Sequence, residues 1–152
     1  QMARHDGMYF TIWYGVYDRR TRELAWAGGG HPPAFLRRGG ELRKLDSTTF
    51  MIGVVDEYDA PTMRTTLEPG DRLYIFSDGV FELHMQDGGI WGLDRLEELM
   101  RADARGSMLD LVVRETTRVT LEGRGVAATD IPADTSGVAW DDDFSLIELR
   151  VN

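Results

Sequence analysis

The sequence contains no cysteine, and this absence excludes several kinds of chemistry at once. Disulfide bonds, thiolate nucleophiles and zinc sites with sulfur ligands cannot form among its 152 residues. The absence also fits a cytosolic location, where disulfides are rare. Long hydrophobic segments are missing as well. Because no run of about eighteen apolar residues exists, we expect no membrane-spanning helix and no membrane partner.

Positive charge is the scarcer sign in this chain. There are 17 Lys and Arg residues against 26 Asp and Glu residues, which gives a formal net charge of −9. Binding to nucleic acid depends mainly on basic side chains that neutralise phosphates, and no basic stripe is evident. We therefore expect no nucleic-acid partner. Solubility explains most of the carboxylates, which leaves a handful as candidates for binding cations.

The length, together with 42% hydrophobic residues, predicts a single domain over residues 1–152. The first half has the composition of β-strands. Residues 8–17 form an apolar and aromatic run, and its near-continuous hydrophobicity predicts a strand buried on both faces. Residues 23–27 follow a polar turn and are its expected antiparallel partner.

Turn signals separate the remaining predicted strands. Gly39-Gly40 lies between two apolar segments and predicts a hairpin. Pro69 followed by Gly70 has the order that a type II turn requires. The predicted strands are residues 34–38, 41–45, 63–67, 72–77 and 144–151.

Two helices are predicted before the last strand. Apolar residues recur at helical spacing in residues 92–101. Ser107, with an aspartate three residues later, has the pattern of a capping box and predicts a second helix over residues 108–122. Gly123 is the expected stop of that helix. Strands followed by segregated helices predict an α+β fold.

Two acidic stretches more than sixty positions apart are the most informative feature. Asp78 follows a predicted strand and precedes Gly79, while Asp142 and Asp143 precede the last strand. Carboxylates at strand ends, beside a glycine that lets other groups approach, suit a hard cation such as Mg²⁺ or Mn²⁺. If the fold brings Asp78 and Asp142 together, the chain carries at least half of a metal site for phosphate chemistry. Strand alternation would put Asp142 and Asp143 on opposite faces. Taken singly, each aspartate is more simply explained as a turn residue.

Three glycines before His31 form the next candidate. They lack the lysine of a P-loop and the spacing of a dinucleotide-binding loop, so we interpret them as a tight crossing of backbones. His31 is either a structural histidine or part of a cleft, and the sequence leaves both open. No serine lies in the G-x-S-x-G elbow of a serine hydrolase.

The order of these motifs is more specific than any one of them. The segments are YFTIWYGVYD (9–18), LAWAGGGHPP (24–33), LEPGDRL (67–73), FSDGVFE (76–82), WGLDRL (91–96) and DDFSL (142–146). In this order, over nearly the whole chain, they resemble the bacterial SpoIIE/RsbU-type branch of the PP2C (PPM) serine/threonine phosphatases.

This resemblance implies an α–β–β–α sandwich of antiparallel sheets, with a two-metal Mn²⁺ or Mg²⁺ site at one edge. It implies hydrolysis of phosphoserine or phosphothreonine on a protein, typically an anti-anti-sigma factor, and an upstream receiver or other sensor domain. Asp78 matches the family's metal-binding Asp-Gly, and Asp142 matches the first ligand of its Asp-Asp-(Ile/Met)-Thr signature. Gly79, Asp143 and His31 are candidates for supporting positions beside the metal.

The chain also departs from the family pattern. Phe144-Ser145 replaces the last two signature residues conservatively. The N-terminal Gly-Asp and Asp-Val-Ser-Gly-His-Gly motifs, which supply the bridging aspartate, do not occur, so the chain corresponds to the C-terminal portion of the domain. Without that bridge we expect one loosely bound cation and weak or no activity from the chain alone. An incomplete sheet would also expose an edge, which favours a homodimer.

Three functional classes are compatible with parts of this pattern. A metal-dependent phosphatase accounts for both the ordered motifs and the two aspartates. A non-catalytic adaptor that binds a sigma-regulatory partner has no need of Asp78 and Asp142, and a generic cation-binding module does not explain the ordered motifs. The sequence therefore predicts a metal-dependent protein serine/threonine phosphatase domain with no catalytic residues beyond its metal ligands.

Overall fold

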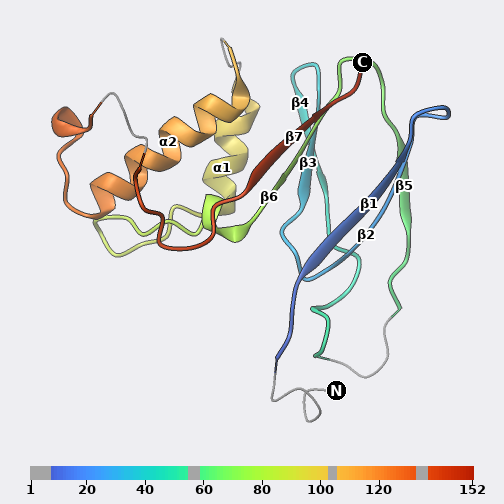
Figure 1. Ribbon diagram of the computed structural model, residues 1–152, viewed down its shortest axis with the longest axis horizontal. Coiled ribbons are helices and arrows are strands. Elements are labelled where there is room, and N and C mark those ends of the chain that lie inside the picture. Colours follow the sequence, from blue (N-terminus) through green and yellow to red (C-terminus); the bar gives the residue numbers. More distant parts are fainter. Residues whose placement is uncertain (1–7, 55–58, 103–105, 133–136) are drawn as a thin grey trace. The chain divides into compact units, whose positions relative to one another are not determined.

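The computed structural model describes residues 8–54, 59–102, 106–132 and 137–152. The elements, in chain order, are β1 (Ile12–Asp18), β2 (Glu23–Gly29), β3 (Ala34–Arg38), β4 (Glu41–Leu45), β5 (Met63–Thr66), β6 (Arg72–Phe76), η2 (Asp78–Val80), α1 (Gly92–Arg101), α2 (Met108–Gly123), η3 (Ala128–Asp130) and β7 (Leu146–Arg150) (Figure 1). The first of two compact units contains Gln1–Gly39, Arg43–Ile75 and Leu149–Asn152, and the second contains Gly40–Leu42 and Phe76–Glu148. Each unit is described by itself.

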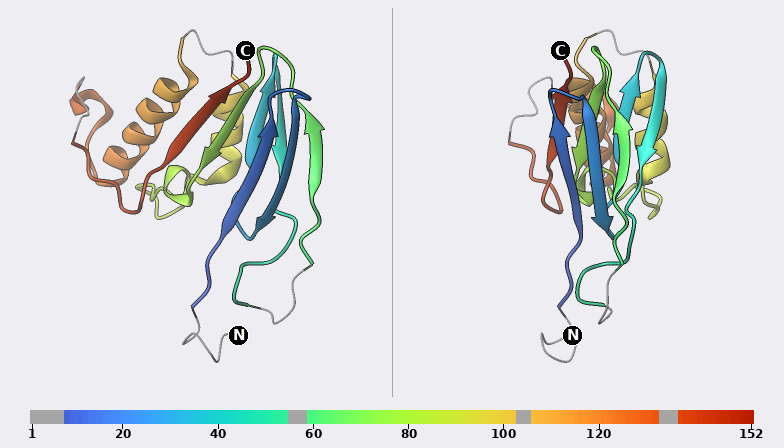
Figure 2. Two further views of the ribbon diagram at one scale, coloured as in Figure 1. Left: turned by 45° about the vertical axis from the view of Figure 1, so that its right-hand side comes forward. Right: turned by 90° about the vertical axis from the view of Figure 1, so that its right-hand side faces the viewer.

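The strands form two antiparallel sheets, as predicted. One has three strands in the order β1-β2-β5, which lie side by side in Figure 2, and the other has four in the order β4-β3-β6-β7. In the first sheet β1 pairs with β2 from Ile12 opposite Gly29 to Asp18 opposite Glu23. The predicted hairpin around Gly39-Gly40 is confirmed by the adjacent strands β3 and β4.

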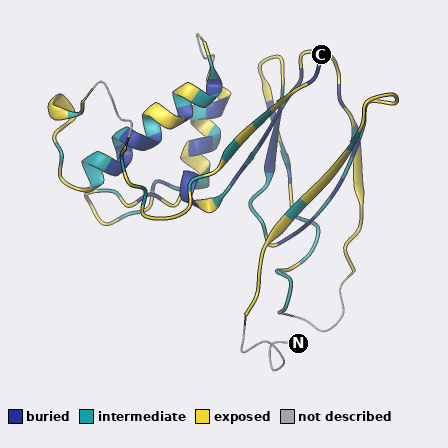
Figure 3. Cartoon of the chain, viewed as in Figure 1, coloured by how far each residue is buried: buried dark blue, intermediate teal, exposed yellow. Residues whose placement is uncertain are grey.

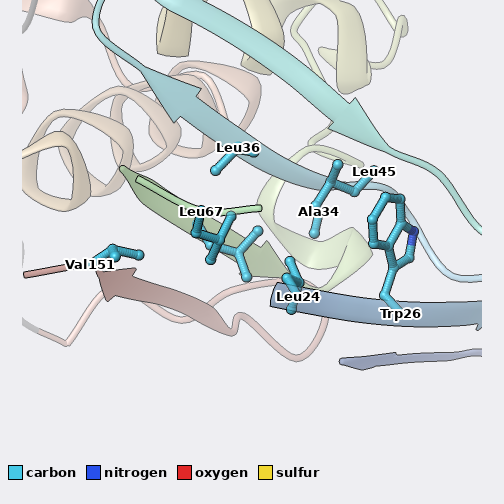
Figure 4. Packing of buried hydrophobic residues seen from close by; sticks show 8 residues of the cluster. Leu24, Trp26, Ala34, Leu36, Leu45, Leu67 and Val151 are labelled. Atoms are coloured by element: carbon cyan, nitrogen blue, oxygen red, sulfur yellow. The ribbon is translucent and has the colours of Figure 1, made fainter. Parts of the chain in front are cut away.

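The core of the first unit contains side chains from both sheets. Leu24 and Trp26 of β2 pack in one cluster with Ala34 and Leu36 of β3, as Figure 4 shows. The cluster is completed by Leu45, Leu67, Leu73 and Val151. The indole N–H of Trp26 donates to the main-chain oxygen of Asp46 at 3.2 Å, so its polar edge is satisfied while its ring is buried. Burial of these apolar side chains is what holds the two sheets together.

The prediction that the first strand is buried on both faces is wrong. Strand β1 is an edge strand, and Tyr14 and Val16 are 63% and 52% exposed (Figure 3). Trp13 and Tyr17, on the alternate positions, pack partly against the core. A continuous apolar run cannot distinguish a strand covered on both faces from an edge strand with an apolar outer face.

The predicted helices are present in the second unit, where α1 and α2 contact each other. Helix α1 has the predicted bounds, and the main-chain N–H of Asp110 donates to Oγ of Ser107 at 3.3 Å, which confirms the cap. Gly123 is not the stop: it belongs to α2, and the left-handed residue is Gly125 at φ +84°. A Cβ on Gly123 would lie 2.0 Å from the main-chain oxygen of His84, so this glycine permits close packing instead. None of the helices in the described ranges is long and apolar enough to cross a membrane.

Asp71 is the buried carboxylate of the first unit, at 1% exposure, and it lies in the predicted type II turn. The turn is confirmed by the hydrogen bond from Asp71 N to Glu68 O at 3.0 Å and by Gly70 at φ +95°. Arg38 donates to both carboxylate oxygens of Asp71, through Nε to Oδ1 at 2.9 Å and Nη2 to Oδ2 at 2.7 Å. Burial raises the pKa of Asp71, but the bonds from Arg38 and from the main-chain N–H of Glu68, with the Arg38 charge, bring the pKa below its ordinary value.

We expect Asp71→Asn to lower the free energy of unfolding by about 1–3 kcal/mol, because the neutral amide cannot accept both hydrogen bonds from Arg38. The lowered folded-state pKa means that the Asp71 contribution is fully present above about pH 4, the unfolded value, and is lost as the pH falls through the folded pKa. Urea unfolding followed by tryptophan fluorescence between pH 7 and pH 3 measures both effects. The variant should therefore differ from the wild type most at neutral pH.

Glu68→Gln is the matched control, because Glu68 binds the same arginine, at 2.7 Å, from a side chain that is 60% exposed. It should cost less than about 1 kcal/mol. Equal losses in the two variants would contradict the assignment of Asp71 as the buried partner.

Candidate functional site

The two acidic stretches meet in the second unit. Asp78 begins the short helix η2 directly after β6, and Asp142 and Asp143 lie in the bend before β7. A Cβ placed on Gly79 would lie 2.6 Å from the main-chain oxygen of Asp143 and 3.4 Å from the carbonyl carbon of Asp142. The main chain of Asp142 and Asp143 therefore lies directly against Gly79, with the carbonyl group of Asp143 nearest, and only a glycine allows this approach.

Ser77 connects the same two segments by hydrogen bonds. Its main-chain N–H donates to the oxygen of Ser145 at 3.0 Å. Its hydroxyl donates to the main-chain oxygen of Asp143 at 2.7 Å and accepts from the main-chain N–H of Ser145 at 2.9 Å. The segment before β7 is thus bonded to the residue that immediately precedes Asp78.

The three aspartates are exposed. Oδ1 of Asp78 accepts from the N–H of Gly79 at 3.1 Å, and Oδ1 of Asp142 accepts from the N–H of Asp143 at 2.7 Å. Neither Oδ2 has a hydrogen-bond donor in the described part of the chain. Because β7 begins only at Leu146, Asp142 and Asp143 do not alternate as strand residues, and the prediction that they occupy opposite faces of a strand is wrong.

Two further contacts hold the flanks of the acidic segment. Nη2 of Arg124, at the C-terminal end of α2, donates to Oδ1 of Asp141 at 2.6 Å. The rings of Trp140 and Phe144 are stacked, with centroids 4.2 Å apart and planes at 21°. The sequence interpretation missed these residues and also Ser77. The aromatic pair at a spacing of four was the one local signal available.

His31 belongs to the first unit and is half-buried. Its Nδ1 donates to the main-chain oxygen of Pro32 at 2.8 Å, and its own main-chain oxygen accepts from Oγ of Ser47 at 2.7 Å. The glycines before it support the interpretation of a tight backbone crossing, because a Cβ on Gly29 would lie 2.9 Å from the main-chain oxygen of Phe50. These contacts are those of a structural histidine.

The donors at the junction of the two acidic stretches suit one hard cation. Each carboxylate has one oxygen oriented by the amide that follows it and one oxygen open to solvent. Mg²⁺ and Mn²⁺ take oxygen ligands, and Mg²⁺ retains several waters when the protein supplies one or two carboxylates. Among the residues that the structure describes, no group of three or more Asp, Glu or His side chains is arranged to hold a metal. The described residues therefore supply two carboxylates at this junction, and water would have to complete the coordination of any cation bound there.

A hollow of about 610 Å³ lies elsewhere in the second unit. It is lined by residues of α1, of α2 and of the segments before α1 and after α2, including Trp91, Arg95, Arg118 and Val126. Arg118 is paired with Glu115 and Glu122 on its own helix. None of the predicted site residues lines this hollow.

Comparison with known proteins adds an independent line of evidence. Residues 1–152 match the family described as Stage II sporulation protein E (SpoIIE). Stage II sporulation protein E of Bacillus subtilis is 27% identical over 115 residues, which covers 74% of this chain and 14% of that protein. Phosphoserine phosphatase RsbU of Bacillus subtilis is 29% identical over 83 residues, which covers 53% of this chain and 25% of that protein. The chain therefore spans a quarter or less of the length of these relatives.

A solved structure shares the fold. The phosphatase domain of SpoIIE from Bacillus subtilis, from a crystal presoaked with manganese, superposes with a TM-score of 0.62 at 20% identity. The match covers 93% of this chain and 56% of the solved one. The antiparallel sheets described above are those of a PP2C phosphatase domain.

We expect Gly79→Ala to displace the segment of Asp142 and Asp143, because the added methyl group would meet backbone atoms and not a flexible side chain. Overpacking of this kind costs about 1–3 kcal/mol. Thermal unfolding gives the loss of stability, and amide chemical shifts of residues 142–145 report the displacement. Gly40→Ala is the control, because a Cβ there meets no heavy atom within 4 Å. Unchanged shifts in Gly79→Ala would contradict the close packing.

Proposed function

This chain belongs to the Stage II sporulation protein E family, as a SpoIIE/RsbU-type PP2C domain, and we propose that it acts as a metal-dependent protein phosphatase on phosphoserine or phosphothreonine. The observation that carries the proposal is the packing of Asp142 and Asp143 against Gly79, which brings their segment beside Asp78. Two carboxylate-bearing segments remote in sequence are thereby placed together at an exposed position.

In this proposal Asp78 and Asp142 are the metal ligands. Gly79 and Asp143 support them through their backbone, Gly79 by its lack of a side chain and Asp143 by the N–H that orients the Asp142 carboxylate. A bound Mn²⁺ or Mg²⁺, or a pair in a complete domain, would lower the pKa of a bound water and neutralise charge on the phosphoryl oxygens. His31 has no assigned part in the chemistry.

The exposure of both aspartates suits a protein-borne substrate. A phosphorylated side chain on a folded partner extends only a short distance, so the groups that receive it must lie at the surface. Likeness to a phosphoserine phosphatase, RsbU, supports phosphoserine as the target. We propose an anti-anti-sigma-type protein as the partner and a receiver or other sensor domain as the source of regulation. The proposal treats residues 1–152 as the C-terminal part of one PP2C domain.

We expect the double variant Asp78→Asn, Asp142→Asn to lose Mn²⁺ binding, because both anionic ligands become neutral amides. Isothermal titration of Mn²⁺ should give a measurable heat with the wild type and a dissociation constant at least about tenfold weaker with the double variant. The variant Asp94→Asn, Asp130→Asn removes the same charge from exposed positions outside the junction, and it should bind as the wild type does. Equally negligible heats in the wild type and the ligand variant would remove the metal argument.

Turnover by this chain alone is expected to be weak, because two carboxylates with water do not hold a stable metal pair. Hydrolysis of a phosphoserine peptide with Mn²⁺ measures it, with and without the Asp78→Asn, Asp142→Asn exchange. Robust turnover that survives the exchange would overturn the assignment of the ligands. Binding of a phosphorylated partner with no Mn²⁺ binding at all would favour the adaptor over the enzyme.

A further inference from the structure

We propose that Ser77 is a positioning residue whose hydroxyl fixes the segment of Asp142 relative to Asp78. The inference rests on the proposed function, since it assigns Ser77 a part in the metal site. Ser77 touches neither carboxylate in the structure. It acts through the main chain of residues 143–145, and its effect on the metal is therefore indirect.

The hydroxyl of Ser77 is used in both directions. A serine hydroxyl has one proton to donate and lone pairs that accept. Here the proton goes to the main-chain oxygen of Asp143, at 2.7 Å, and a lone pair accepts the N–H of Ser145, at 2.9 Å. With the main-chain bond from Ser77 N to Ser145 O, at 3.0 Å, three hydrogen bonds join one residue to this segment.

Three bonds restrain the segment more than one bond does. The main-chain bond alone would leave the peptides between Asp143 and Ser145 free to rotate about it. The two hydroxyl bonds end on different residues, and together they fix the orientation of these peptides as well as their distance. Because Asp142 is the residue directly before, its carboxylate takes its place relative to Asp78 from this arrangement.

The other contacts of the segment do not substitute for Ser77. Gly79 allows the peptide to approach but supplies no hydrogen bond to it. The ion pair of Arg124 with Asp141 and the stacking of Trp140 on Phe144 lie at the flanks of the segment, and neither pair includes a residue of η2. Ser77 therefore supplies the directional link between the two acidic stretches.

Loss of the hydroxyl should weaken metal binding without removing a ligand. Residues that orient metal ligands typically change metal affinity by about 10–100-fold when they are replaced. We expect Ser77→Ala to bind Mn²⁺ about tenfold more weakly than the wild type. Ser77→Thr keeps a hydroxyl and should retain the wild-type affinity, whereas Ser77→Val has the shape of threonine without the hydroxyl and should behave as Ser77→Ala.

The experiment is a Mn²⁺ titration of the ¹⁵N-labelled chain, followed by paramagnetic broadening of amide signals. This readout detects weak binding and needs no catalytic turnover. In the wild type the amides of Gly79 and Asp143 should broaden together at low Mn²⁺. In Ser77→Ala and Ser77→Val they should broaden only at about tenfold higher concentration, and the amide of Ser145 should lose protection from hydrogen exchange in the metal-free protein.

Ser107→Ala is the matched control for a general loss of stability. It removes a serine of the same unit that also holds a main-chain N–H, at the start of α2, and it should leave the Mn²⁺ affinity unchanged. Broadening at neither segment in the wild type would overturn the proposed function itself. Normal broadening in the wild type with equal affinities for Ser77→Thr and Ser77→Val would overturn the role of Ser77 alone, even if Ser77→Ala does not fold.

Discussion

The close approach of two backbones at Gly79 is the constraint on which the candidate site depends. A methyl group at this position would meet the main-chain oxygen of Asp143 at 2.6 Å, a separation that real Cβ atoms essentially never show. With glycine there, the carbonyl group of Asp143 packs onto the start of η2, and Ser77 bonds to the main chain of Asp143 and Ser145. The relative placement of the carboxylates is thus determined by residues that carry no charge.

Local chemistry predicted most of the fold, because its signals act over a few residues. Pro69 and Gly70 specify a turn through their backbone angles, and Ser107 caps a helix through an amide three residues away. The two errors in the predicted fold, the burial of β1 and the end of α2, both depend on which residues lie beside these elements in the folded chain. Whether β1 is covered on its outer face depends on what lies beside it. Gly123 stays within α2 and packs against the main chain of His84, and the left-handed glycine that follows the helix is Gly125.

The sequence predicted the aspartates of the candidate site and the close approach at Gly79, but it did not predict Ser77 or Arg124. Asp78 and Asp142 could be predicted because two carboxylates at strand ends suit a cation, and because the ordered motifs include the same two residues. Ser77 and Arg124 carry no such signal, since their partners are 66 and 17 positions away and are chosen by the fold. At Gly79 the sequence indicated that another group approaches closely, but it did not identify that group as the main chain of Asp143.

The carboxylates would bind a metal, whereas the uncharged residues position the two segments. An enzyme and an adaptor of this family would therefore differ in whether they need the carboxylates. An adaptor that only binds a partner protein does not need carboxylates at this junction. Two exposed aspartates brought together repel each other by about 1 kcal/mol or less in water, a small cost that a cation reverses. A chain that keeps both the uncharged packing and the repelling pair keeps two carboxylates for which an adaptor has no use, and this is why we favour the phosphatase over the adaptor.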